Sequence, residues 1–183
     1  MISAAVFAAV AIIAGTSILV YAVSRNTRDL SGTPVDVATS GVTIIENADP
    51  GFGRKEISFK NNKSTNSPVL LRIAYSETWT NSNNEIVSNM VGNTNVVTKN
   101  WTTAFAQDFV DGQDGWYYYK KTLEPLAQVQ VLSSIALNDN SYNVYNYDIA
   151  FRFEAVQADA TAASELWGKT VTIANGVATW TLP

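Results

Sequence analysis

The sequence predicts a mainly β protein, a jelly-roll-like antiparallel β-sandwich preceded by an apolar N-terminal helix. Three observations lead to this prediction. Residues 1–24 contain no charged side chain. Beyond residue 40, short runs alternate apolar and polar residues, as strands with one buried face do. Clusters of Gly, Pro, Asn and Asp separate these runs at the spacing typical of a sandwich or jelly roll.

Composition limits the classes of function. The chain has 183 residues, 15% of them charged, and a net charge of −4. It therefore lacks the excess of Lys and Arg that binding to nucleic acid requires. It contains no Cys and no His, which removes thiolate nucleophiles, the usual zinc ligands and the best proton-transfer group near neutral pH. We expect no enzymatic activity, no cofactor and no bound metal.

The segment 1–24, as an α-helix, would span roughly 35 Å, enough to cross a bilayer core of about 30 Å. Three uses remain open: a signal peptide cleaved after Ala22, a permanent anchor, or a retained helix that packs in the middle of a filament. In the last case, small side chains would let identical helices approach closely. These are Ala8, Ala11 and Gly15. We expect contact with a membrane only before or during export.

Residues 25–40 are polar and compatible with an extended linker or with a strand donated to another copy. An open sheet edge exposes unpaired backbone groups, and a strand from a second copy can satisfy them in a contact that propagates. Pro34 would sit at a strand end or bulge. The apolar candidates for such a strand are Leu30, Val35, Val37, Val42 and Ile44.

A sandwich domain is predicted over residues 41–183. Its first two strands, near 42–45 and 56–60, flank a turn at 49–53. A loop over 61–68 follows. The next strand places alternate apolar residues on one face: Val69, Leu71, Ile73 and Tyr75. Residues 81–84 form a turn, and 85–101 mix Asn, Thr and Val without clean periodicity, which indicates short strands and loops.

The aromatic run at 116–121 predicts a strand near a sheet edge. Its polar-tipped rings lead us to expect a surface aromatic patch for a protein contact or, in the alternative, for sugar rings. The patch comprises Trp116, Tyr117, Tyr118 and Tyr119. The preceding acids, Asp108, Asp111 and Asp114, do not follow the alternate spacing of a calcium loop, and we interpret them as solvated turn residues.

The C-terminal third contains the clearest patterns. An apolar strand is predicted at 129–137, and the longest alternating run, 145–155, predicts a central core strand. An Ala-rich stretch at 158–166 fits a short helix ended by Gly168. The dipeptide Asn175-Gly176 between two β-rich runs predicts a hairpin with a tight primed turn.

Three stretches of the sandwich domain resemble one known family. The first runs from Ser40 through Asp49-Pro50-Gly51 to Lys60-Asn61-Asn62; the second is 111–121 followed by Leu123-Glu124-Pro125; the third is 154–158 leading to Leu166-Trp167-Gly168. In this order they are similar to the secreted fibre proteins of bacterial biofilm matrices grouped with TasA and camelysin, especially the BsaA type. The resemblance covers most of residues 40–168.

The resemblance implies a jelly-roll domain, export by a dedicated signal peptidase, and polymerisation in which an N-terminal strand of one subunit completes the sheet of the next. The unusual N-terminus and the final hairpin depart from the family and leave the assembly mode open. Camelysin-type relatives have been described as metallopeptidases, but this chain lacks the His ligands of a catalytic zinc site.

We therefore expect a structural subunit of an extracellular filament, a biofilm-matrix fibre or a pilus. Its expected partners are copies of itself, with a second fibre protein as a further candidate, and its expected location is the cell surface or the medium. The alternative is a cell-surface adhesin or carbohydrate-binding β-sandwich module, which glycan binding by the monomer would identify.

Overall fold

The computed structural model describes residues 24–27, 41–49, 52–62, 68–87 and 90–183. The expected N-terminal helix and most of the 25–40 segment lie outside these residues. The described part of the chain is mainly β, and its paired strands are antiparallel. Neither of its two α-helices is long and apolar enough to cross a membrane.

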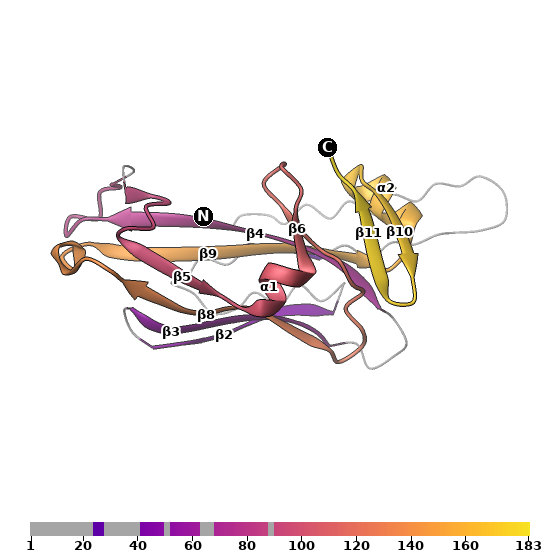
Figure 1. The fold of residues 1–183 in the computed structure, drawn as a ribbon, viewed down its shortest axis with the longest axis horizontal. Helices are drawn as coiled ribbons and strands as arrows, with labels where there is room; N and C mark the ends of the chain where they lie inside the picture. The colour runs from indigo at the N-terminus through magenta and orange to yellow at the C-terminus, as the bar shows by residue number, and fades with distance from the viewer. Residues whose placement is uncertain (1–23, 28–40, 50–51, 63–67, 88–89) are drawn as a thin grey trace, which may run out of the picture.

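Two sheets form the layers of the molecule (Figure 1). The first sheet has five strands, in the order β1 (Ser24–Thr27), β9 (Asn146–Gln157), β4 (Val69–Thr80), β7 (Tyr117–Tyr119) and β6 (Phe109–Asp111). The second has four, in the order β2 (Val42–Ala48), β3 (Gly53–Asn61), β8 (Gln128–Leu137) and β5 (Val97–Trp101). The predicted strands at 69–75, 129–137 and 145–155 are thus confirmed, and β9 has a partner on each side.

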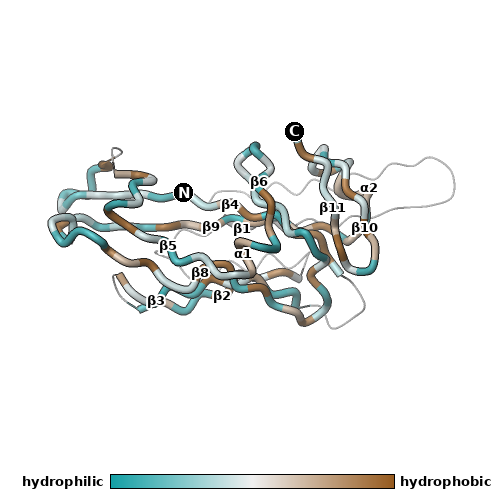
Figure 2. Tube along the Cα trace, viewed as in Figure 1, coloured by the Kyte–Doolittle hydropathy of each residue, from teal (hydrophilic) through white to brown (hydrophobic). Residues whose placement is uncertain are grey.

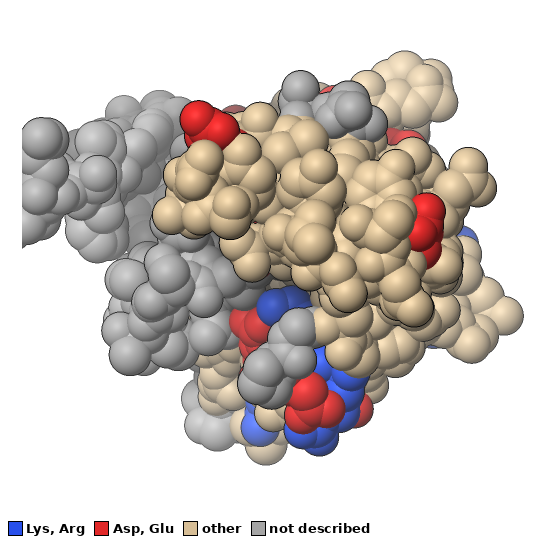
Figure 3. Space-filling model, turned by 90° about the vertical axis from the view of Figure 1, so that its left-hand side faces the viewer, with Lys and Arg blue, Asp and Glu red and all other residues tan. Residues whose placement is uncertain are grey.

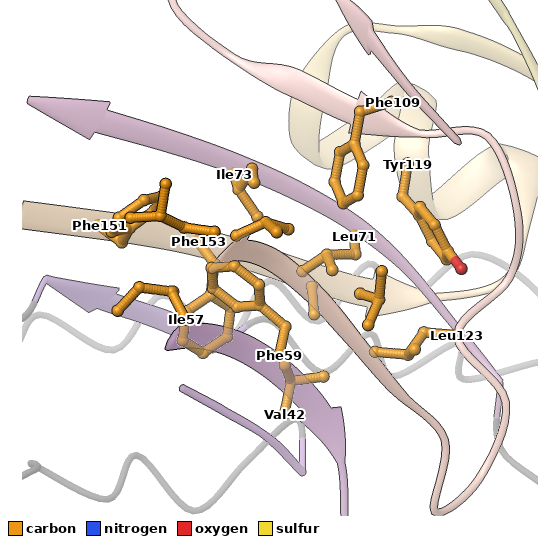
Figure 4. Close-up of a cluster of buried hydrophobic side chains, with 14 of the residues drawn as sticks. Val42, Ile57, Phe59, Leu71, Ile73, Phe109, Tyr119, Leu123, Phe151 and Phe153 are labelled. Carbon is orange, nitrogen blue, oxygen red and sulfur yellow. The ribbon is translucent and has the colours of Figure 1, made fainter. Parts of the chain in front are cut away.

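The main core lies between the two sheets (Figure 4). Phe59 of β3 packs edge-on against Phe151 and Phe153 of β9, with ring centroids 6.5 and 5.6 Å apart. The hydropathy pattern along the trace shows the alternation that builds this core (Figure 2). Because the predicted apolar face of β4 also belongs to it, with Leu71 and Ile73 fully buried, the assignment of inward faces is confirmed.

A second cluster covers the outer face of the first sheet. Helix α2 (Ala160–Trp167) and the hairpin of β10 (Thr170–Ala174) and β11 (Val177–Thr181) pack there against Leu70 and Val156. Gly168 ends α2 in the left-handed conformation, with φ 64°. The predicted short helix and the predicted hairpin are both confirmed, and the outer face of β4 and β9 is buried as well as the inner one.

The loops at one end of the sandwich close over a third cluster, built around fully buried Trp79 with Met90, Val96 and Val97. Strand β5 is the short strand expected within 85–101. It leads into α1 (Thr103–Asp108), which was not predicted. The hydroxyl of Thr102 caps this helix by accepting a hydrogen bond from the Phe105 N–H at 3.1 Å. A short 3-10 helix, η2 (Asn140–Tyr142), lies between β8 and β9.

Candidate assembly site

Among the described residues, strand β9 is only partly paired along one of its two edges. It has 12 residues, all of which are in register with β4, from Asn146 to Gln157. On its other side, β1 pairs with four of them, from Arg152 to Ala155. No strand of the described chain lies beside residues 146–151 on that side. A sheet edge that is only partly paired with a neighbouring strand can be extended by a further strand.

Strand β2 forms an edge of the opposite sheet, because its one strand partner among the described residues is β3. Since β3 packs directly against β9 through Phe59, β2 lies on the same side of the sandwich as β1. We call the β1–β9 edge together with the neighbouring β2 edge the assembly edge. Of its three strands, β1 and β2 come from the N-terminal part of the chain, and β9 pairs directly with β1.

The predicted assembly residues divide into two groups. Val42 and Ile44 lie in β2, where they pair with Asn61 and Phe59 of the same chain. Val42 is buried in the main core and Ile44 packs against it. These two side chains therefore complete their own sheet. The others lie outside the described residues: Ala8, Ala11, Gly15, Leu30, Val35 and Val37.

The expected surface patch of four aromatic side chains is not formed. Tyr118 is fully buried and Tyr119 is 8% exposed, while Trp116 and Tyr117 are half-buried. The prediction is wrong for the two buried tyrosines because both faces of this sheet are covered. Tyr119 packs against Phe109 in the main core, and Tyr118 faces the second cluster.

Tyr118 is part of a hydrogen-bonded chain across the outer face. Its hydroxyl donates to Asp114 Oδ2 at 2.8 Å and accepts from Arg72 Nη1 at 3.0 Å. Burial and the neighbouring Asp114 raise the pKa of Tyr118 to about 12. Arg72 also bonds Glu154, with Nη2 2.6 Å from Oε2. Lys169, just after α2, continues the chain to Asp114 Oδ2 at 2.9 Å.

The Arg72 guanidinium is held between indole rings. It lies 4.4 Å from the ring centroid of Trp116 and 4.7 Å from that of Trp167, and Arg152 lies 4.6 Å from the centroid of Trp116. These contacts fasten α2 to the sheet. Because two guanidinium groups already stack on Trp116, its ring is not a free platform for a sugar, and the geometry gives the carbohydrate-binding alternative no support.

The acidic residues near the turn are held by separate partners. Asp108 pairs with Lys121 at 2.8 Å, and Asp111 Oδ1 accepts from the Gln113 N–H at 2.8 Å. Partial burial of Asp114 opposes ionisation, but hydrogen bonds from Lys169 and Tyr118 outweigh it and lower the pKa of its carboxyl. In the part of the chain that the structure describes, no three potential metal ligands are grouped in a way that could hold a metal ion.

Another buried carboxylate, Glu77, links the two sheets. Its Oε1 atom lies 2.7 Å from Lys99 Nζ on β5, and both side chains are less than one-tenth exposed. Tyr147 donates to Glu77 Oε2 at 3.3 Å. The carboxylate is therefore engaged by a cation and a hydroxyl, an arrangement that stabilises the sandwich.

Comparisons with protein-family models, with curated proteins and with solved structures found no match to this chain.

Proposed function

We propose that this chain is a structural, non-enzymatic subunit of an extracellular filament, polymerising head to tail by donation of its N-terminal strand. The observation that carries the proposal is the partly covered assembly edge. The four residues of β1 lie beside one end of the 12-residue β9 and leave the rest of that edge without a strand among the described residues. A strand from another copy fits such an edge because backbone hydrogen bonds supply much of the affinity.

Strand donation would replace a β1–β9 pairing within one chain by the same pairing between two chains. The segment that forms β1 in one chain can make the same ladder with β9 of a neighbour, so the exchanged contacts cost little. Residues 28–40 separate β1 from β2 and supply the length for such a swap. Because donor segment and acceptor edge are different surfaces, the contact is heterologous and repeats along a line instead of closing into a dimer.

The order of the strands supports a jelly-roll-like arrangement of the domain. Strands that follow one another in the chain fall in opposite sheets at several crossings: β3 and β4, β4 and β5, β8 and β9. The sheet order β1-β9-β4-β7 opposite β3-β8-β5 resembles that of a jelly roll with one strand fewer, and β2 is added beside β3. In that arrangement β1 is the first strand of the barrel-like sandwich, and its donation would leave the remaining strands in place.

Export is the second part of the proposal. Residues 1–24 carry no charge and are long enough to serve as a signal sequence or as a retained helix that packs in the filament core. Both uses place the sandwich outside the cell. A non-catalytic role is supported by a sequence without His or Cys and by buried carboxylates that pair with Arg72 and Lys99.

The first test is electron microscopy of material shed from producing cells, combined with intact mass and N-terminal sequencing of the subunit. Filaments whose subunits begin near Val23 would support a cleaved signal and strand donation. Filaments whose subunits begin at Met1 would support assembly through a helical core instead. A soluble monomer without filaments would contradict the proposal.

A further inference from the structure

Exposed apolar side chains gather at the two ends of the sandwich. The register of β4 and β9 defines these ends, because Thr80 pairs with Asn146 at one and Val69 with Gln157 at the other. In the described part of the chain, all the large hydrophobic side chains that are markedly exposed lie in end connections or at a hairpin tip. They are Ile86 (73% exposed), Val91 (46%) and Val144 (66%) at the first end, and Leu126 (60%) and Val177 (50%) at the second.

We define the loop pole as the described residues of two connections, 81–87 with 90–96 and 138–145. The Asn138 side chain joins them by donating to the Thr94 carbonyl at 3.0 Å. The sequences of both connections contain no Lys or Arg, and their charged residues are Glu85 and Asp139, both exposed. Figure 3 views this end, where the broad upper surface is uncharged with isolated acidic atoms, and basic atoms gather mainly in the lower part.

We define the hairpin pole as the connection 120–127 and the tip of the β10–β11 hairpin, 174–177. The Thr122 N–H joins them by donating to the Gly176 carbonyl at 2.8 Å. Lys120 and Lys121 are exposed here, and Lys60 is nearby because it pairs with Gln128 at the start of β8. Glu124 is the one acid within these two segments, and Asp108 of α1 pairs with Lys121 at 2.8 Å. Three lysines against these two acids leave this pole with an excess of one positive charge.

Leu126 adds an independent observation. Its φ is 63°, in the left-handed region where Gly or Asn would have the lower backbone cost. Its backbone N–H is fixed by donating to the Asn61 carbonyl at 2.8 Å. A leucine side chain held in this conformation and 60% exposed contributes little to the fold of its own subunit. Such strain with exposure is typical of a contact surface.

We propose that the loop pole of one subunit docks against the hairpin pole of the next. Two copies of the same pole would repel each other, whereas the acidic and the lysine-rich pole attract and bury their apolar side chains together. This contact is heterologous and points along the long axis of the sandwich, so it repeats head to tail. The inference rests on the proposed filament function and supplies a second contact, separate from strand donation, that sets the polarity of the filament.

The test reverses one charge at a time in the full-length chain. Val144→Lys places a cation on the loop pole, and Leu126→Glu places an anion on the hairpin pole. Each variant alone then meets a like charge in the next subunit, and we expect filament mass, measured by sedimentation and electron microscopy, to fall at least about tenfold. Matched controls carry the same charges away from both poles, Ser76→Lys and Ser76→Glu at an exposed position in the middle of β4, and should assemble like the wild type.

Mixing the two variants gives the decisive result. The altered loop pole of the Val144→Lys chain is compatible with the altered hairpin pole of the Leu126→Glu chain, and the remaining poles are unchanged. An equimolar mixture should therefore form filaments in which the variants alternate, and recovery also shows that both variants are folded. If each single variant assembles normally while the wild type forms filaments, or if the mixture does not recover, the pole contact is overturned but the filament function stands. If the wild type itself never assembles, the filament function is overturned.

Discussion

Arg72 and Glu154 are buried although the alternating pattern of their strands predicts that they face solvent. Both alternate with apolar residues, a position that faces solvent in a strand with one buried face, yet they are 8% and 7% exposed. Charged groups are buried at acceptable cost when they pair and satisfy their hydrogen bonds. Here Arg72 has Glu154, Tyr118 and two indole rings as partners. The pair thus belongs to the interface between the sheet and α2.

We predict that Arg72→Leu destabilises the domain by about 3–5 kcal/mol, because the buried Glu154 carboxylate loses the guanidinium that faces it. Urea unfolding followed by circular dichroism measures the change. Arg152→Ala is the matched control, since Arg152 is exposed and stacks on the same Trp116 ring, and it should cost less than about 1 kcal/mol. The double variant Arg72→Leu/Glu154→Leu should recover part of the loss. Equal effects of the two single arginine substitutions would contradict this account.

At the scale of elements, the sequence predicts those helices, strands and turns that are determined by neighbouring residues along the chain. The alternation in β4 and β9, the apolar run of β8, the Asn-Gly hairpin and the Gly-terminated helix all follow from short-range periodicity or turn chemistry. The six-residue α1 and the three-residue β6 were not predicted, because so few residues carry no periodicity and both depend on packing. Burial of Tyr118 was missed for a related reason: the sequence does not show that α2 covers its sheet.

The end of α2 supplies a prediction at this scale. Gly168 has φ 64° and its N–H donates to the Ser164 carbonyl at 3.0 Å, as in a left-handed helix cap. Gly168→Ala should lower the free energy of unfolding by about 1 kcal/mol, because a Cβ is disfavoured in this conformation. Ser164→Ala, on the exposed side of the same helix, should change it by less than about 0.5 kcal/mol. Thermal unfolding distinguishes the two variants. If Gly168→Ala leaves the free energy of unfolding unchanged, the cap contributes little to stability.

The described part of the molecule combines a domain whose strands are well packed with one sheet edge that is only partly paired. The mainly β, antiparallel character of the domain was predictable from the sequence because alternation and turns recur along the chain. The sequence led to the expectation of a donated strand but could not indicate which sheet edge is partly paired, because that edge is defined by which strands become neighbours in space. That depends on long-range pairing of β1, β9 and β2, and a pattern within one strand contains no information about it.

The assembly edge leads to a prediction about the whole molecule. A chain beginning at residue 28 lacks β1 but retains every strand from β2 onward. It should therefore fold and accept a donated strand, but it has no β1 strand to donate to the next subunit. Alone it should remain monomeric. Added at about one part in ten to the full-length chain, it should shorten filaments severalfold in electron micrographs, because growth stops wherever it is incorporated.

Saturating the acceptor edge provides the control for this experiment. A synthetic peptide of residues 22–40 supplies β1 in trans, so a shortened chain incubated with it beforehand has no edge left to accept a donor and should no longer shorten filaments. A peptide with the same composition in scrambled order should leave the effect unchanged. If the shortened chain has no effect on filament length, or forms filaments on its own, β1 is not the donated element. Assembly would then have to proceed through the poles or through the segment 1–24.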